Sequence, residues 1–129
     1  MARCLKQIFA LLIGAALTNA ALAADALGTL DGAVAKLNDW NSSGAERNAA
    51  ISTLRNARGA ALDHVRVLLK SDVWMARRDA VTLAAEFGPP NLGKMLAEAL
   101  VDKNWAVREC GASLAAANSA NRAEAEPGL

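Results

Sequence analysis

Leucine, valine and alanine recur at helical spacing along most of the chain. Three apolar stripes, with steps of three or four residues, occupy residues 27–37, 62–69 and 92–100. Such spacing places the apolar side chains on one face of a helix and favours helices that bury that face. No stretch shows the sustained alternation of a strand, so the pattern predicts an all-α chain.

A second helical segment follows each stripe, and two of these segments are nearly the same. Residues 71–85 read SDVWMARRDAVTLAA, and residues 102–116, which begin 31 positions later, read DKNWAVRECGASLAA. A fainter copy surrounds Arg47, 30 positions before Arg77. Internal similarity at a period of about 20–50 residues is typical of repeat proteins. The sequence therefore predicts about three helix pairs that stack into a short α-solenoid.

Turn-forming residues divide the predicted pairs. Ser43 and Glu46 match a capping box, in which the two side chains satisfy free amides at a helix start. Gly59 and the run 88–90, which reads Gly-Pro-Pro, predict helix ends because proline cannot continue the helical ladder and glycine tolerates a left-handed cap. Asn104 is the predicted N-cap of the last helix.

The amino-terminal residues 1–23 have the pattern of a secretory signal peptide. Arg3 and Lys6 precede an uncharged, mostly apolar stretch over residues 8–17, and Ala21-Leu22-Ala23 supplies the small residues that signal peptidase requires. A retained transmembrane anchor is the alternative, but spanning a bilayer takes about 20 apolar residues. We expect cleavage after Ala23, a periplasmic or secreted chain, and no stable membrane insertion after cleavage.

Removal of the signal leaves residues 24–118 as the predicted repeat domain and residues 119–129 as a predicted disordered tail. The whole chain has 14 Lys+Arg and 13 Asp+Glu, and loss of Arg3 and Lys6 leaves 12 against 13, a net charge near −1. Nucleic-acid binders normally carry a basic excess, so no nucleic-acid partner is expected. Cys110 is the one cysteine of the exported chain, which excludes an internal disulfide there.

The repeated segments resemble a known family. Residues 102–108, followed by Gly111-Ala112 and Leu114, resemble HEAT-like repeats of the phycobilisome-lyase type, and Ala76-Arg77 is the next best match. The resemblance covers Leu27 to about Asn118 and implies an α-solenoid. It indicates little about function, because such repeats serve chromophore lyases, adaptors and scaffolds alike.

One arginine stands at an equivalent position near the start of each second helix. These are Arg47, Arg77 and Arg108. Resemblance to the family implies that they form a structural ladder by hydrogen-bonding to neighbouring turns, with Asp102 as the clearest acceptor. A planar guanidinium suits this task better than lysine. Direct ligand binding by the arginines is the alternative.

Polar rows on the second helices are candidate partner-binding positions. One row holds Ser52, Thr82 and Ser113, and the adjacent row holds Asn48, Arg78 and Glu109. We expect both rows to line the inner face of the stack, where extended partners commonly bind. Ordinary solvated surface is the alternative.

Two further features are candidates for an interface. Trp74 and Trp105 are expected at one edge of the stack, and tryptophan is enriched in binding hot spots; packing over the turns is the alternative. Ala112 and Ala116 give the last helix a small, uncharged outer face where a terminal repeat normally carries charge. The face is expected to dock weakly on a partner or a second copy, unless the tail residues Arg122, Glu124 and Glu126 shield it.

No catalytic, cofactor-binding or metal-binding set emerges from the sequence. His64 is the sole histidine, expected on a solvated helix face, and a metal site needs several convergent donors. Cys110 aligns with Asp79 and Ala49, and is either a small buried residue or a partly exposed thiol.

These patterns predict an exported, non-enzymatic helical repeat module that binds a protein or peptide in the bacterial periplasm, without a cofactor. The alternatives are an enzyme-accessory or lyase-like protein, and a structural subunit that stacks on a larger repeat protein.

Overall fold

The computed structural model describes the backbone of residues 29–125 and the side chains of residues 29–120. Residues 29–37 are helical and are followed, in chain order, by α2 (Gly44–Ala57), the 3₁₀ turn η1 (Arg58–Ala61), α3 (Leu62–Leu68), α4 (Trp74–Phe87), α5 (Leu92–Leu100) and α6 (Trp105–Ala125). No strand occurs in this part of the chain, so the predicted all-α class is confirmed. The predicted signal and its cleavage position lie outside the described residues.

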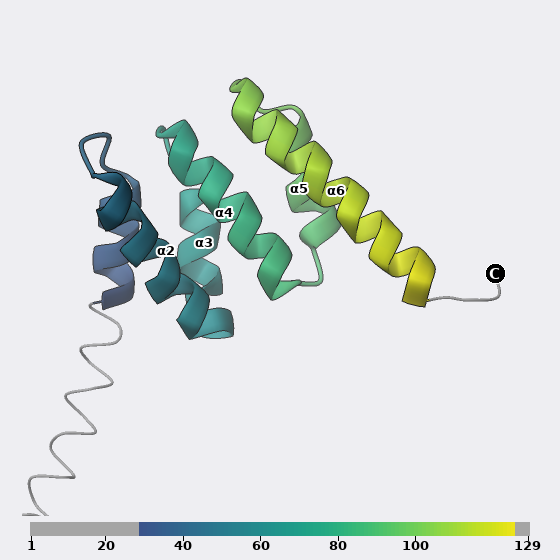
Figure 1. The fold of residues 1–129 in the computed structure, drawn as a ribbon, viewed down its shortest axis with the longest axis horizontal. Helices are drawn as coiled ribbons and strands as arrows, with labels where there is room; N and C mark the ends of the chain where they lie inside the picture. The colour runs from purple at the N-terminus through teal and green to yellow at the C-terminus, as the bar shows by residue number, and fades with distance from the viewer. Residues whose placement is uncertain (1–28, 126–129) are drawn as a thin grey trace, which may run out of the picture.

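The helices form two layers that follow the chain from one end of the molecule to the other (Figure 1). Helices α2, α4 and α6 lie side by side in the nearer layer, with helix 29–37, α3 and α5 behind them. We call helix 29–37 with α2 the first pair, α3 with α4 the second pair, and α5 with α6 the third pair. The first and third pairs therefore form the two ends of the described stack.

Three of the predicted helix boundaries are confirmed. Ser43 Oγ accepts from the backbone N–H of Glu46 at 3.1 Å, and the Glu46 carboxylate accepts from the backbone N–H of Ser43 at 2.8 Å, which completes the capping box. Gly88 ends α4 in a left-handed conformation with φ of 62°. Asn104 Oδ1 accepts from the backbone N–H of Ala106 at 2.9 Å at the start of α6.

Two boundaries differ from the prediction. Helix α2 ends at Ala57, and the residue with positive φ is Arg58 (φ 48°), because the chain enters the 3₁₀ turn one residue before Gly59. Helix α6 runs to Ala125, so the tail predicted to be disordered from residue 119 is helical over 119–125. Alanine-rich sequence supports a helix here, and no proline or glycine interrupts it before Pro127.

The core consists of two apolar clusters. The larger cluster joins the first and second pairs through side chains such as Leu37, Leu54 and Leu68, all fully buried. The smaller cluster joins α4 to the third pair and contains Val81, Leu96, Ala99 and Val107. Each pair thus buries its apolar face against a neighbour. None of the described helices is long and apolar enough to cross a membrane.

Helices α5 and α6 cross closely at Gly111. A Cβ atom added to Gly111 would lie 2.8 Å from Ala99 Cβ and 3.3 Å from the Ala99 carbonyl carbon, so α6 approaches α5 at a distance that only glycine permits.

Candidate interaction surface at the end of the helix stack

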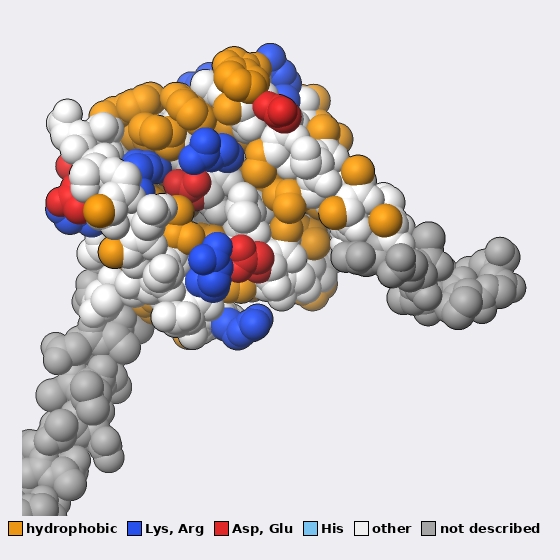
Figure 2. All heavy atoms as spheres, in the orientation of Figure 1, with side chains coloured by type: hydrophobic (Ala, Val, Ile, Leu, Met, Phe, Trp, Pro, Cys, Tyr) orange, Lys and Arg blue, Asp and Glu red, His pale blue; other side chains and the backbone are white. Residues whose placement is uncertain are grey.

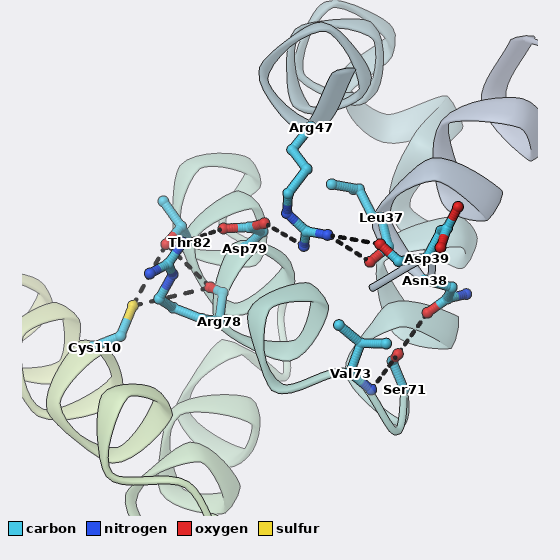
Figure 3. Close-up of polar contacts among 10 residues, drawn as sticks. All are labelled: Leu37, Asn38, Asp39, Arg47, Ser71, Val73, Arg78, Asp79, Thr82 and Cys110. Carbon is cyan, nitrogen blue, oxygen red and sulfur yellow. Dashed lines mark hydrogen bonds and ion pairs between the residues drawn. The ribbon is translucent and has the colours of Figure 1, made fainter. Parts of the chain in front are cut away.

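Arg47 forms the first rung of the predicted ladder. Its Nη1 donates to the carbonyl oxygen of Leu37 at the end of helix 29–37 (3.1 Å) and to that of Asp39 in the turn before α2 (3.5 Å). Its Nη2 donates to Asp79 Oδ2 of the second pair at 3.2 Å, and both side chains are buried (Figure 3). Arg47 therefore holds its own turn and the next pair at the same time.

Arg77 forms the second rung, with a carboxylate partner in the turn before α6, whereas the partner of Arg47 lies on α4. Its Nη1 donates to the Ser71 carbonyl at 2.8 Å, while Nε and Nη2 donate to the two carboxylate oxygens of Asp102 at 2.8 and 2.9 Å. These hydrogen bonds from Arg77 lower the pKa of Asp102 and raise the pKa of Arg77. The backbone N–H of Asn104 also donates to Asp102 and lowers its pKa further.

Arg108 forms a third rung that differs from the other two. Its Nη1 donates to the Asp102 carbonyl at 2.7 Å, so it holds its own turn as predicted. Its side chain is exposed, and no carboxylate among the described side chains pairs with it. Arg47 and Arg77 each form an ion pair with an aspartate of the following helix pair. In the described stack no pair follows the third, so Arg108 has no such partner.

Asp79 was missed by the sequence analysis as a ladder residue. Its side chain is 8% exposed, and besides Arg47 it accepts a hydrogen bond from Arg78 Nη2 at 3.3 Å. Its position aligns with Ala49 and Cys110, which gave no sign of an ion pair. The one sign in the sequence that Asp79 has a special role was that an acidic residue is aligned there with small apolar residues.

Thr82, the middle residue of the predicted polar row, lies at a junction between helix pairs and not on an open inner face. The Thr82 hydroxyl donates to the Arg78 carbonyl at 3.2 Å and lies 3.5 Å from Cys110 Sγ on α6 (Figure 3). Cys110 Sγ also lies 3.9 Å from the same carbonyl, and the thiol is half-buried. Thr82 faces the third pair because α4 and α6 pack side by side, whereas Ser52 and Ser113 of the same row are exposed.

The two predicted tryptophans have different surroundings and do not form one exposed edge. Trp74 is half-buried against the cluster that joins α4 to the third pair, with the Arg78 guanidinium 5.4 Å from its ring centre. Trp105 is 67% exposed. The third pair covers Trp74, whereas nothing described covers Trp105. Trp40, which the sequence analysis did not consider, is 56% exposed in the turn before α2.

The face of α4 that meets the third pair has an exposed counterpart on α6. On α4 this face includes Arg77, Arg78, Val81 and Thr82. The residues 31 positions later, together with Ala116 one turn further, are all exposed; we call them the end face, and they are Arg108, Glu109, Ala112, Ser113 and Ala116. The two predicted candidate sets, polar row and alanine face, therefore meet on one surface.

Beyond Arg108 and Glu109, the end face carries no charged side chain. Residues 110–121 contain no charged side chain, and Figure 2 shows hydrophobic and uncharged side chains along α6 beyond its first turns. Because α6 is helical to Ala125, Arg122 and Glu124 continue along the helix and do not fold back over Ala112. The helical backbone therefore contradicts a tail that folds back at Arg122 and Glu124, and Glu126 lies outside the described residues.

The described residues hold no cluster of possible metal ligands. No three histidine, cysteine or acidic side chains gather there as metal ligands. His64 is half-buried and not on a solvated face as predicted: its Nε2 lies 3.0 Å from Asp31 Oδ1 on helix 29–37. The histidine joins the first pair to the second.

Comparisons with family models, with curated proteins and with solved structures found no match to this chain. The geometry of the chain itself is therefore the basis for assigning a function.

Proposed function

We propose that this chain is an exported helical repeat module, without enzymatic activity, that binds a protein or peptide partner through its end face in the bacterial periplasm. The proposed architecture is a short α-solenoid of three HEAT-like pairs. Recurrence of one arginine contact in all three pairs supports this architecture, since each arginine donates to a carbonyl of the turn before its helix. The basic, apolar and small-residue pattern of residues 1–23 supports export.

One observation carries the binding proposal: α6 exposes the residues whose α4 equivalents lie at a helix-pair junction. Terminal repeats normally carry a polar, charged outer face, because an uncovered stacking surface lowers solubility. Here that face presents Ala112, Ser113 and Ala116, and the exposed ring of Trp105 lies about two turns before Ala112 on the same helix. An aromatic anchor on a helix that also exposes small residues provides both a contact point and room for close approach of another helix.

Capture from periplasmic extract, followed by mass spectrometry, tests the proposal with two matched double variants. Ala112→Glu/Ala116→Glu places two carboxylates on the end face and is expected to abolish capture of the partner. Ala60→Glu/Ala97→Glu adds the same charge at two exposed positions away from α6 and is expected to leave capture unchanged. Equal capture by the two variants would contradict the proposed site. Circular dichroism checks that both variants remain helical.

A further inference from the structure

The first pair carries a groove that matches a face buried elsewhere in the stack. The groove has a volume of about 380 Å³ and is lined from α2 by Glu46, Ala49, Ala50 and Thr53. The residues 30 positions later on α4 are all buried, and they are Ala76, Asp79, Ala80 and Leu83. Asp79 of this set contacts Arg47 of the preceding pair. The groove is therefore the first pair's copy of a packing face.

The groove opens away from the second pair. Helix 29–37 contributes Thr29, Gly32, Ala33 and Lys36 to its wall. Asp31 and Asn38 lie on the other side of this segment, where they contact His64 and Ser71 of the second pair. One end of the stack thus exposes this groove, while the other exposes the α6 end face.

The two ends also carry complementary halves of a ladder rung. Asp39 matches Asp102 in two contacts: each carboxylate accepts from the backbone N–H two residues later, and each carbonyl accepts from the ladder arginine of its own pair. Asp102 additionally binds Arg77 of the preceding pair. No arginine or lysine among the described side chains pairs with the Asp39 carboxylate. At the opposite end, Arg108 has no carboxylate partner within the same part of the chain.

We infer that a second copy of this chain stacks head to tail on the first, with Arg108 of one copy bound to Asp39 of the next. The α6 end face then lies on the groove of the first pair, and the next copy covers Trp105 as the third pair covers Trp74. This inference rests on the proposed function, because it names the partner of the same end face. A contact between two different faces leaves one face of each kind free on a dimer, so further copies add until the rotation between copies closes a ring.

Sedimentation velocity of the purified full chain over a range of concentrations tests this inference. The parent chain is expected to form dimers and longer species as concentration rises. Arg108→Asp or Asp39→Arg alone places like charges together at every junction, so each is expected to weaken association at least tenfold. An equimolar mixture of these two variants is expected to restore association, because each junction again joins one arginine to one aspartate. The double variant Arg108→Asp/Asp39→Arg is expected to do the same.

Rescue by the mixture separates a broken junction from a misfolded chain, since two misfolded variants would not associate when combined. Lys94→Asp is the charge control for Arg108→Asp: it makes the same change in net charge at an exposed position on α5 and is expected to associate like the parent.

A parent chain that stays monomeric throughout, or single variants that associate as tightly as the parent, would overturn the inference. If Ala112→Glu/Ala116→Glu still abolished capture of a different protein in that case, the proposed binding function would stand and the second copy would be excluded as its partner. The inference is supported if the single charge variants lose self-association and their mixture regains it. This holds whether or not another protein is captured from periplasmic extract.

Discussion

Gly111 shows how one residue sets the distance between two helices. Its missing Cβ allows α6 to approach Ala99 of α5 so closely that a methyl group would lie 2.8 Å from the Ala99 methyl. The neighbouring atoms that a methyl would meet include backbone atoms of α5, which cannot move without shifting the helix. Glycine is favoured at this position in spite of its low helix propensity.

Gly111→Ala is therefore expected to destabilise the fold, although alanine is the better helix former. Overpacking costs about 1–3 kcal/mol, which exceeds the roughly 1 kcal/mol gained in helix propensity. Gly93→Ala in α5 is the control, because a methyl group added there would have no neighbouring atom within 4 Å, and it is expected to stabilise by up to about 1 kcal/mol. Urea denaturation of both variants measures the two effects, and a stabilised Gly111→Ala would contradict the close crossing.

Arg58 holds a backbone conformation that favours glycine, with φ of 48° and ψ of −122°. Such conformations cost about 1–3 kcal/mol for a residue with a Cβ. Arg58→Gly is expected to raise the free energy of unfolding by about 1 kcal/mol after the entropic cost of glycine. Arg58→Ala removes the same charge but keeps the Cβ, so it is expected to give no gain. Equal stability of the two variants in thermal denaturation would show that the backbone is not strained there.

The ladder acts at the level of helical elements, because each buried arginine joins a turn to the following pair. Arg77 and Asp102 have side-chain exposures of 8% and 13%, so their two hydrogen bonds are largely shielded from water. Arg55 and Glu86 form a similar two-bond pair between α2 and α4, but their side chains are 47% and 37% exposed. Burial distinguishes the two pairs, whose chemistry is the same.

Asp102→Asn is expected to destabilise the fold by about 3 kcal/mol at neutral pH, because it leaves a buried guanidinium without its counter-charge. Glu86→Gln makes the equivalent change in the exposed pair and is expected to cost less than about 1 kcal/mol. Denaturant titrations of the parent and the two variants measure both costs. Similar losses in the two variants would contradict the difference assigned to burial.

The pH dependence of the Asp102 variant follows from the direction of its pKa shift. Hydrogen bonds from Arg77 lower the pKa of Asp102 in the folded chain, so its contribution is present at neutral pH and is lost as the pH falls through that lowered value. The stability difference between the parent and Asp102→Asn is expected to narrow below about pH 4, where an unperturbed aspartate becomes protonated. A difference that stays constant down to about pH 2 would contradict the shift.

Sequence patterns predicted the local elements well, since their determinants lie within a few residues of one another. The capping box at Ser43, the left-handed Gly88 and the cap at Asn104 are all of this kind. The burial of Asp79 could not be predicted in the same way, because its partner Arg47 is 32 positions distant. The orientation of the Thr82 row likewise depends on how one pair rotates against the next, which a single repeat does not encode.

The molecule as a whole depends on contacts between pairs. One apolar cluster joins the first two pairs, and a second joins α4 to the third pair. We expect the chain to unfold as one cooperative unit, with coincident thermal transitions in far-ultraviolet circular dichroism and tryptophan fluorescence. Two separate transitions, or a spectrum dominated by strand, would contradict this expectation.

The dependence on contacts between helix pairs also explains why Trp74 and Trp105 differ in exposure. The repeated sequence predicted equivalent positions for the two rings, and the backbone positions are equivalent at the starts of α4 and α6. Their exposure differs because a neighbour covers one ring and not the other. The exposure of Trp105 results from its place at the end of the described stack, so alignment of the repeats does not reveal it.

Site-specific photo-crosslinking in the native host tests most directly whether the end face binds a partner. A photoreactive amino acid at Ser113 on the end face is compared with one at Ala97 on α5, both exposed positions on the third pair. The proposal predicts a discrete crosslinked species from position 113 that is absent from position 97, with mass spectrometry identifying the partner or a second copy. Crosslinking at position 97 alone, or none at position 113, would contradict the assignment of the end face as the binding surface.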